Sequence, residues 1–212
     1  MGQSKSKKAM PDYEAPLRQK IQLLYNIRDF ATEIVSATTE VIDAFNVPGP
    51  EPKRTHNVAI GLASYLSVHG TICSPFFEEY GKFLFLMRAG YDKISREQAI
   101  FHQKVIDKVI EPFEKWLTVD YKHMHEQILE LRERAKRQHI AASKIAKKKS
   151  IERMIAYELT NREFQLQLGI VKVQLGKLEK IREAHNSYLR QLIEAMDDYN
   201  DRISKILEQH AK

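Results

Sequence analysis

The feature that most constrains this chain is a long helical seam of apolar residues that leads directly into a basic stretch. Across residues 106–145 the seam positions alternate in steps of three and four, a spacing typical of a coiled-coil stripe. The seam comprises Ile106, Ile110, Phe113, Leu117, Tyr121, Met124, Ile128, Leu131, Ala135, Gln138, Ala142 and Ile145. With Ser95 and Gln98 as a capping box, we expect this helix to run from Ser95 to about Lys149. A helix of that length measures about 80 Å, so it cannot belong to a compact globule.

Positive charge is concentrated at the end of this helix. Residues 132–153 hold nine basic side chains against Glu133 and Glu152, a local excess of seven, whereas the whole chain has a formal net charge of +6. The nine are Arg132, Arg134, Lys136, Arg137, Lys144, Lys147, Lys148, Lys149 and Arg153. A long helix with its charge at one end suits a polyanionic surface better than a small-molecule pocket.

Helical periodicity also appears before and after this segment. A first helix begins near Pro16 and stops at the cluster of prolines and glycine in residues 48–52. Residues 55–94 predict broken or bent helix, with Thr55 and Ser74 as possible caps and Gly70, Pro75, Gly81 and Gly90 as possible interruptions. After a corner at residues 147–152, one last helix is expected to continue to about Gln209.

The predicted fold class is therefore all-α: an elongated, antiparallel three-helix coiled coil. Pro112 lies inside the longest helix, where we expect it to produce a kink. Residues 58–91 are apolar on several sides and rich in aromatic residues. Since a thin rod cannot bury that surface alone, we expect a second copy to cover it, which predicts a homodimer.

The N-terminus supplies a second signal for a membrane surface. Met1 to Ser6 fit the pattern Met-Gly-x-x-x-Ser/Thr, which predicts myristoylation of Gly2. One myristoyl chain binds membranes only marginally, and Lys5, Lys7 and Lys8 can supply part of the second signal that stable binding requires. We interpret residues 1–14 as a flexible basic tail and residues 15–210 as one helical domain. No apolar run is long enough to span a membrane, and the single cysteine favours a cytoplasmic, peripheral protein.

Other site chemistries find little support in the residues. His123 and His125 point about 200° apart on a helix, so they are poorly placed to share one metal ion. The spacing of Gly169 and Gly176 favours close helix approach rather than a phosphate loop, and the apolar surroundings of Cys73 indicate a buried side chain. No nucleophile and base are paired in a motif. We therefore expect no enzyme activity, no metal and no cofactor.

Two segments resemble the BAR (Bin/amphiphysin/Rvs) domain family. Residues 101–107 (FHQKVID) and 109–113 (VIEPF), followed by a basic helix, are similar to the second BAR helix, and residues 188–206 are similar to the closing helix. The resemblance covers roughly residues 17–208. It implies a crescent-shaped dimer that binds, senses or generates membrane curvature. By position it would place Arg132 to Lys144 on the distal arm, Lys147 to Lys149 at the tip and Pro112 at a bend.

These observations predict a peripheral membrane-binding, curvature-sensing or membrane-remodelling dimer that binds anionic phospholipid through its basic arm and tip. An acyl chain on Gly2 would take the place of the amphipathic insertion helix that the tail lacks. The alternative is a coiled-coil adaptor that binds a small GTPase or another protein. We do not expect nucleic acid as a partner, because no aromatic residues are interleaved with the basic residues to stack on bases.

Overall fold

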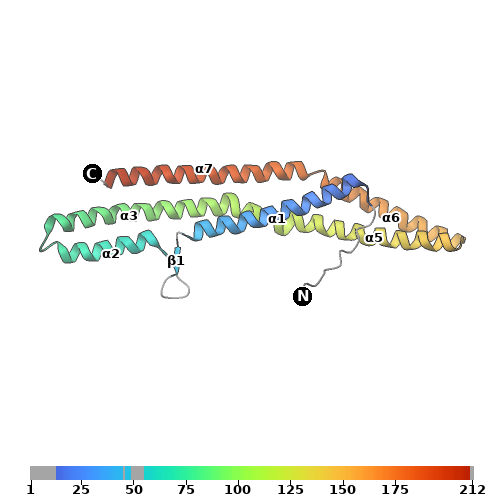
Figure 1. Cartoon of the computed structure of the whole chain (residues 1–212), viewed down its shortest axis with the longest axis horizontal. Helices are drawn as coiled ribbons and strands as arrows, with labels where there is room; N and C mark the ends of the chain where they lie inside the picture. Colours follow the sequence, from blue (N-terminus) through green and yellow to red (C-terminus); the bar gives the residue numbers. More distant parts are fainter. Residues whose placement is uncertain (1–12, 45, 49–54, 211–212) are drawn as a thin grey trace, which may run out of the picture. The chain divides into compact units, whose positions relative to one another are not determined.

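A computed structural model describes residues 13–44, 46–48 and 55–210, and in this part of the chain nearly all residues are helical. Helix α1 spans Ala15–Asp43 and is followed by two short antiparallel strands, β1 (Asn46–Pro48) and β2 (Thr55–Asn57), in which Val47 pairs with His56. Next come α2 (Val58–Cys73) and α3 (Glu78–Val105). The chain continues through η1 (Ile106–Ile110), α4 (Glu111–Lys115), η2 (Trp116–Tyr121) and α5 (Lys122–Lys147). Helices α6 (Ile151–Leu175) and α7 (Leu178–His210) complete it (Figure 1). The predicted all-α fold class is confirmed.

The chain divides into two compact units. The first unit comprises Met1–Ala31 and Lys115–Glu183, and within it α5 and α6 pack against each other as an antiparallel pair. The second unit comprises Thr32–Glu114 and Ala184–Lys212, and within it α2 folds back along α3.

The heptad seam forms most of the core of the first unit. Met124, Ile128 and Leu131 are buried, as are Val171 and Leu175 on α6. In the second unit the seam residue Phe113 is fully buried, and His185 on α7 is buried beside it with ring centroids 4.6 Å apart. The prediction of an apolar stripe at coiled-coil spacing is confirmed at these positions.

Several predicted boundaries were wrong. The helix that contains the buried residue Ser95 begins at Glu78, not at Ser95, and it starts after Phe77 without a side-chain cap. Thr55 lies in β2 and does not cap a helix. The break predicted between residues 55 and 94 does occur, at residues 74–77, and Pro75 lies inside it.

Two glycines were interpreted as interruptions although they lie inside α3. A Cβ added to Gly81 would come within 2.8 Å of the Cα of Ser74, and one added to Gly90 would come within 3.2 Å of the His210 ring. Both positions are therefore close approaches between neighbouring segments of the second unit. A glycine that brings backbones together inside a helix has the same sequence appearance as one that ends a helix.

The last helix is also divided, at residues 176 and 177. The backbone N–H of Gly176 donates to the carbonyls of Lys172 and Val173, which ends α6 in a tightened turn. Gly169 is exposed, and a Cβ placed there would touch nothing within 4 Å, so the prediction of close helix approach at Gly169 was wrong. Cys73 is only partly buried.

Pro112 is accommodated without a break in the helical chain. An α-helix would need an N–H at residue 112 to donate to residue 108, and proline has none. The preceding turn is instead widened to π geometry over Ile106–Ile110, with the Glu111 N–H donating to the carbonyl of Ile106. Wide turns of this kind are a recognised cause of helix bending, so a kink at Pro112 remains a prediction.

Candidate functional site

A basic corner, residues 147–150, joins α5 to α6 in the first unit. Helix α5 ends at Lys147 because the backbone of Lys148 is extended, with φ −156° and ψ 120°. Ser150 is extended as well, and its hydroxyl oxygen accepts a hydrogen bond of 3.3 Å from the backbone N–H of Arg153. This N-cap starts α6. The side chains of Lys147, Lys148 and Lys149 are all exposed. None of them forms an ion pair with any residue that the structure describes.

Three arginines of the basic stretch are turned toward the protein instead. Arg132 is half-buried, and its guanidinium donates to the Tyr25 hydroxyl on α1 at 3.1 Å. Arg134 lies 2.7 Å from the Glu130 carboxylate and donates to the carbonyl of Glu163 on α6 at 3.2 Å. The hydrogen bond from Arg134 is the main reason that the pKa of Glu130 falls below its usual range. These arginines hold α1 and α6 against α5.

Arg153 closes the corner itself. One guanidinium nitrogen donates to the carbonyls of Lys144 and Lys148, at 2.9 and 3.2 Å. Lys144 lies in the last turn of α5, where its carbonyl also accepts from the backbone N–H of Lys148, and Lys148 is the residue that follows the helix. Carbonyls at a helix C-terminus commonly take such additional partners. A positive charge at a helix C-terminus is also favoured by the helix dipole. Arg153 is therefore a structural cap as well as a surface cation.

The other basic residues of α5 remain accessible. Lys136, Arg137 and Lys144 are exposed, and the contact of Lys136 with Glu133 is a loose one of 3.9 Å. The structure thus separates the nine basic side chains into two groups. Six are exposed on α5 and the basic corner, and three take part in hydrogen bonds within the first unit.

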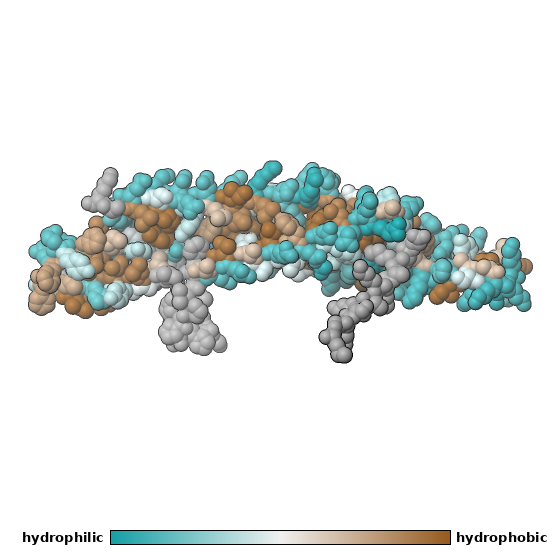
Figure 2. Space-filling model, viewed as in Figure 1, coloured by the Kyte–Doolittle hydropathy of each residue, from teal (hydrophilic) through white to brown (hydrophobic). Residues whose placement is uncertain are grey.

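Exposed apolar side chains lie next to the lysines on the first turns of α6. Ile151 is 77% exposed, Met154 52% and Ile155 56%. Figure 2 shows hydrophilic and hydrophobic surface side by side at this end of the α5–α6 pair. Sequence reasoning did not single out these three residues, because it considered only the charge of this stretch. The signal that could have found them is their i, i+3, i+4 spacing immediately after three lysines.

The start of α1 is fixed to the first unit by a cluster of aromatic and cationic groups. Tyr13 is buried, and burial raises the pKa of its hydroxyl to about 12. Tyr25 and Tyr121 both contact the His125 ring, with centroids 5.8 and 5.7 Å away. Burial lowers the pKa of His125, and the nearby charges of Arg132 and Arg28 lower it further. Gly2, Lys5, Lys7 and Lys8 lie outside the described residues.

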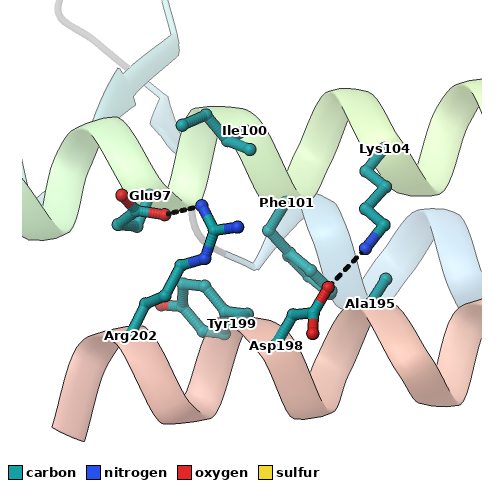
Figure 3. Close-up of a pocket in the computed structure, with 8 residues that line it drawn as sticks. All are labelled: Glu97, Ile100, Phe101, Lys104, Ala195, Asp198, Tyr199 and Arg202. Carbon is teal, nitrogen blue, oxygen red and sulfur yellow. Dashed lines mark hydrogen bonds and ion pairs between the residues drawn. The ribbon is translucent and has the colours of Figure 1, made fainter. Parts of the chain in front are cut away.

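A second cluster, in the second unit, joins α3 to α7 (Figure 3). Lys104 reaches Asp198 at 2.6 Å, and Arg202 reaches Glu97 at 3.1 Å. Between these ion pairs the Phe101 and Tyr199 rings stack with centroids 4.9 Å apart. The hydrogen bond from Lys104 lowers the pKa of Asp198. The hollow beside them has a volume of only about 20 Å³, so this cluster holds two helices together and has no room for a ligand.

Large apolar side chains are exposed along α2 and the first half of α3. The set comprises Ile60, Leu62, Tyr65, Val68, Ile72, Phe76, Phe77, Tyr80, Phe83, Phe85 and Leu86. Figure 2 shows brown surface over this part of the second unit. Monomeric proteins rarely expose a large contiguous apolar patch, so these residues are candidates for an interface.

The described part of the chain contains neither a candidate metal site nor a candidate membrane-spanning helix. His, Cys, Asp and Glu side chains do not gather there in any group of three that could hold a metal ion. None of the helices in that part is long and apolar enough to cross a bilayer.

Comparison with known proteins identifies the family of this chain. No curated protein matches it. The model of one protein family, described as BAR domain, matches residues 20–212, which is most of the sequence. This match agrees with the helical architecture and with the resemblance found in the sequence. The chain therefore belongs to the BAR domain family.

Proposed function

We propose that this protein is a peripheral membrane protein that binds anionic lipid through its basic corner and the exposed basic residues of α5. BAR domains are structural modules that generally dimerise, bind lipid membranes and sense or remodel curvature, and they are not enzymes. The observation that carries the proposal is the exposure of Lys147, Lys148 and Lys149, without acidic partners among the described residues. Near an anionic bilayer each such cation contributes about 1 kcal/mol.

The membrane-binding set is proposed in two parts. The residues that would contact lipid are Lys136, Arg137, Lys144 and the three corner lysines. The residues that would hold α1, α5 and α6 together are Arg132, Arg134 and Arg153.

The exposed Ile151, Met154 and Ile155 support adsorption at a lipid interface, because apolar side chains beside cations suit the headgroup region. The binding that survives about 0.5 M salt should therefore fall in Ile151→Ser and persist in Val173→Ser, which changes a similarly exposed site on the same helix.

A homodimer is the second part of the proposal. The exposed apolar residues of α2 and α3 would be covered by a second copy, because removing so many large apolar side chains from water is favourable. Dimerisation would double the number of basic corners per particle, so the second engagement would occur at high effective concentration. Analytical ultracentrifugation that finds only monomer at micromolar concentration would contradict it.

The tail is proposed to supply an acyl anchor. Residues 1–14 would form the tail and residues 15–210 the helical domain, with Gly2 acylated and Lys5, Lys7 and Lys8 near the lipid. Gly2→Ala should then move much of the protein from membranes to the cytosol in cells, with no change in thermal unfolding. Unchanged membrane localisation of that variant would show that the motif is accidental.

The proposal is tested by sedimentation of the purified chain with liposomes. The protein should sediment with vesicles that contain phosphatidylserine and stay in the supernatant when the vesicles are neutral, and its binding should weaken as salt rises. Electron micrographs of the bound vesicles should show tubules or a preference for small diameters.

The second candidate is a protein adaptor. Leu159, Leu166, Ile170 and Val173 form a further exposed apolar set on α6, which a small GTPase or another protein partner could cover. An adaptor does not require acidic lipid. Failure to bind anionic liposomes at low salt would favour this candidate.

A further inference from the structure

An open groove lies between α5 and α6, and the membrane proposal does not explain it. Its volume is about 250 Å³, and it lies one to three turns before the basic corner. Ile140 and Ala141 of α5 and Ala156 of α6 give it apolar walls. Thr160 lies at one end, with its hydroxyl hydrogen-bonded to the carbonyls of Ala156 and Tyr157. Recognition of a polar ligand here must therefore come from the charged groups.

Three cations line this groove, and no carboxylate does. Arg137 and Lys144 extend from α5 and Arg153 from α6. The Arg153 guanidinium is held in place by its hydrogen bonds to the carbonyls of Lys144 and Lys148, which involve one of its three nitrogens. A guanidinium has five N–H donors, so others remain for a ligand. Like charges brought together around one hollow repel each other, and an anion in the hollow would relieve that repulsion.

The chemistry of the groove specifies the kind of anion. A lipid with a single diffuse negative charge can be attracted by any exposed lysine. A phosphomonoester carries about −1.5 to −2 and three acceptor oxygens, which can accept from the several donors of the three side chains that line the groove. The groove is slightly smaller than the roughly 300 to 1,000 Å³ of typical small-molecule sites, so it suits a head group rather than a whole lipid.

We propose that the groove of Arg137, Lys144 and Arg153 binds a phosphomonoester-bearing head group, such as the phosphorylated inositol of an anionic lipid. This inference rests on the proposed membrane function and deepens it. The basic corner would supply general attraction to anionic surfaces, and the groove would supply selectivity among anionic lipids.

The experiment compares vesicles of equal surface potential, matched by measured zeta potential, that contain either phosphatidylserine or phosphatidylinositol bisphosphate. The full chain should bind the second kind at least tenfold more tightly. Arg137→Gln with Lys144→Gln should abolish that preference, and the loss of two lipid-facing charges should also weaken binding to phosphatidylserine vesicles. Lys148→Gln with Lys149→Gln removes the same charge outside the groove, so it should weaken binding to both vesicles and retain the preference.

A second pair of variants keeps the charge and changes only the size of one side chain, inside or outside the groove. Ala156→Leu fills the groove, and Ala146→Leu adds the same group to an exposed site on α5 that does not line it. The first should lose the preference and the second should keep it. Circular dichroism confirms the fold of each variant.

Calorimetry with soluble inositol trisphosphate identifies the source of the ligand. Weak binding, with tight binding only on vesicles, supports a lipid head group, and tight groove-dependent binding in solution supports a free inositol phosphate at the same site. Equal affinity for the two kinds of vesicle, or a preference that survives both groove variants, would overturn the inference while leaving the membrane proposal intact. Failure of the wild type to bind either kind of anionic vesicle would instead overturn the membrane proposal.

Discussion

Arginine and lysine have the same charge in the basic stretch, but the structure uses them differently. Arg132, Arg134 and Arg153 each donate hydrogen bonds to an oxygen of the first unit, whereas Lys147, Lys148 and Lys149 project from it. The planar guanidinium offers several donors in a fixed geometry, and the ammonium is a mobile, strongly hydrated point charge. The difference suits arginine to holding helices together and lysine to contacting a fluid surface.

His185 is a titratable residue in a largely apolar environment. It is 5% exposed on α7, and its ring contacts Phe113 and Tyr188 in the second unit. Burial lowers its pKa to about 4. In the unfolded chain a histidine titrates near 6.5, so between these values the folded state binds fewer protons than the unfolded state.

Stability should therefore depend on pH through this residue. The stabilisation is complete above about pH 6.5 and is lost progressively as the pH falls toward 4, by about 1 to 3 kcal/mol once solvent screening is allowed for. Denaturant unfolding of the wild type and of His185→Phe, measured from pH 7.5 to 4, checks this. The variant should have a shallower pH dependence, and identical slopes would rule out His185 as the cause.

At the scale of elements, the contacts between α3 and α7 show which interactions stabilise a helix pair. The ion pairs Lys104–Asp198 and Glu97–Arg202 are largely exposed, and such pairs contribute about 0 to 1 kcal/mol. Phe101, between them, is 4% exposed and stacks on Tyr199. Burial of the aromatic ring should dominate.

Phe101→Ala should therefore lower the free energy of unfolding by about 3 to 5 kcal/mol, because it removes a buried ring and leaves a cavity. Lys104→Met, which keeps the apolar stem and removes only the charge, should cost less than about 1 kcal/mol. Denaturant titration of both variants provides the comparison. Equal losses would mean that the ion pair stabilises the helix pair as much as the buried ring does, which would contradict this prediction.

Pro112 offers a test of how one element is bent. Pro112→Ala restores an N–H that can donate within the helix, so the π turn over Ile106–Ile110 should tighten while stability holds or rises. If the proline sets the direction of the arm, the variant should change its relative binding to small and large liposomes. Wild-type preference for vesicle diameter in the variant would show that Pro112 does not set curvature.

Long periodic elements were predictable from the sequence, and short or glycine-containing ones were not. The seam through Met124, Ile128 and Leu131 was found because burial repeats with the helical period. The start of α3 was missed because Gly81 serves a close contact that only the folded chain reveals. Strands β1 and β2 have three residues each, too few for any period to show.

At the scale of the whole molecule, the sequence predicted a basic candidate site but could not tell which of its cations are exposed. The local charge excess placed the membrane-binding candidates at one corner, because charge density needs no knowledge of packing. Which of the nine cations face solvent depends on partners far apart in the chain, such as Tyr25 for Arg132. The groove lined by Arg137 and Arg153 could not be predicted for the same reason, because it exists only where α6 packs against α5.

The most direct test of the central claim is the affinity of a corner variant for anionic liposomes. Lys147→Glu, Lys148→Glu and Lys149→Glu together replace three attractions by three repulsions, which at about 1 kcal/mol per charge should weaken binding a hundredfold or more at low salt. The effect should shrink near about 0.5 M salt, where screening is short-ranged. A control with the same charge change at the exposed Lys93, Lys108 and Lys205 should lose much less. Wild-type affinity in the correctly folded corner variant would contradict the account.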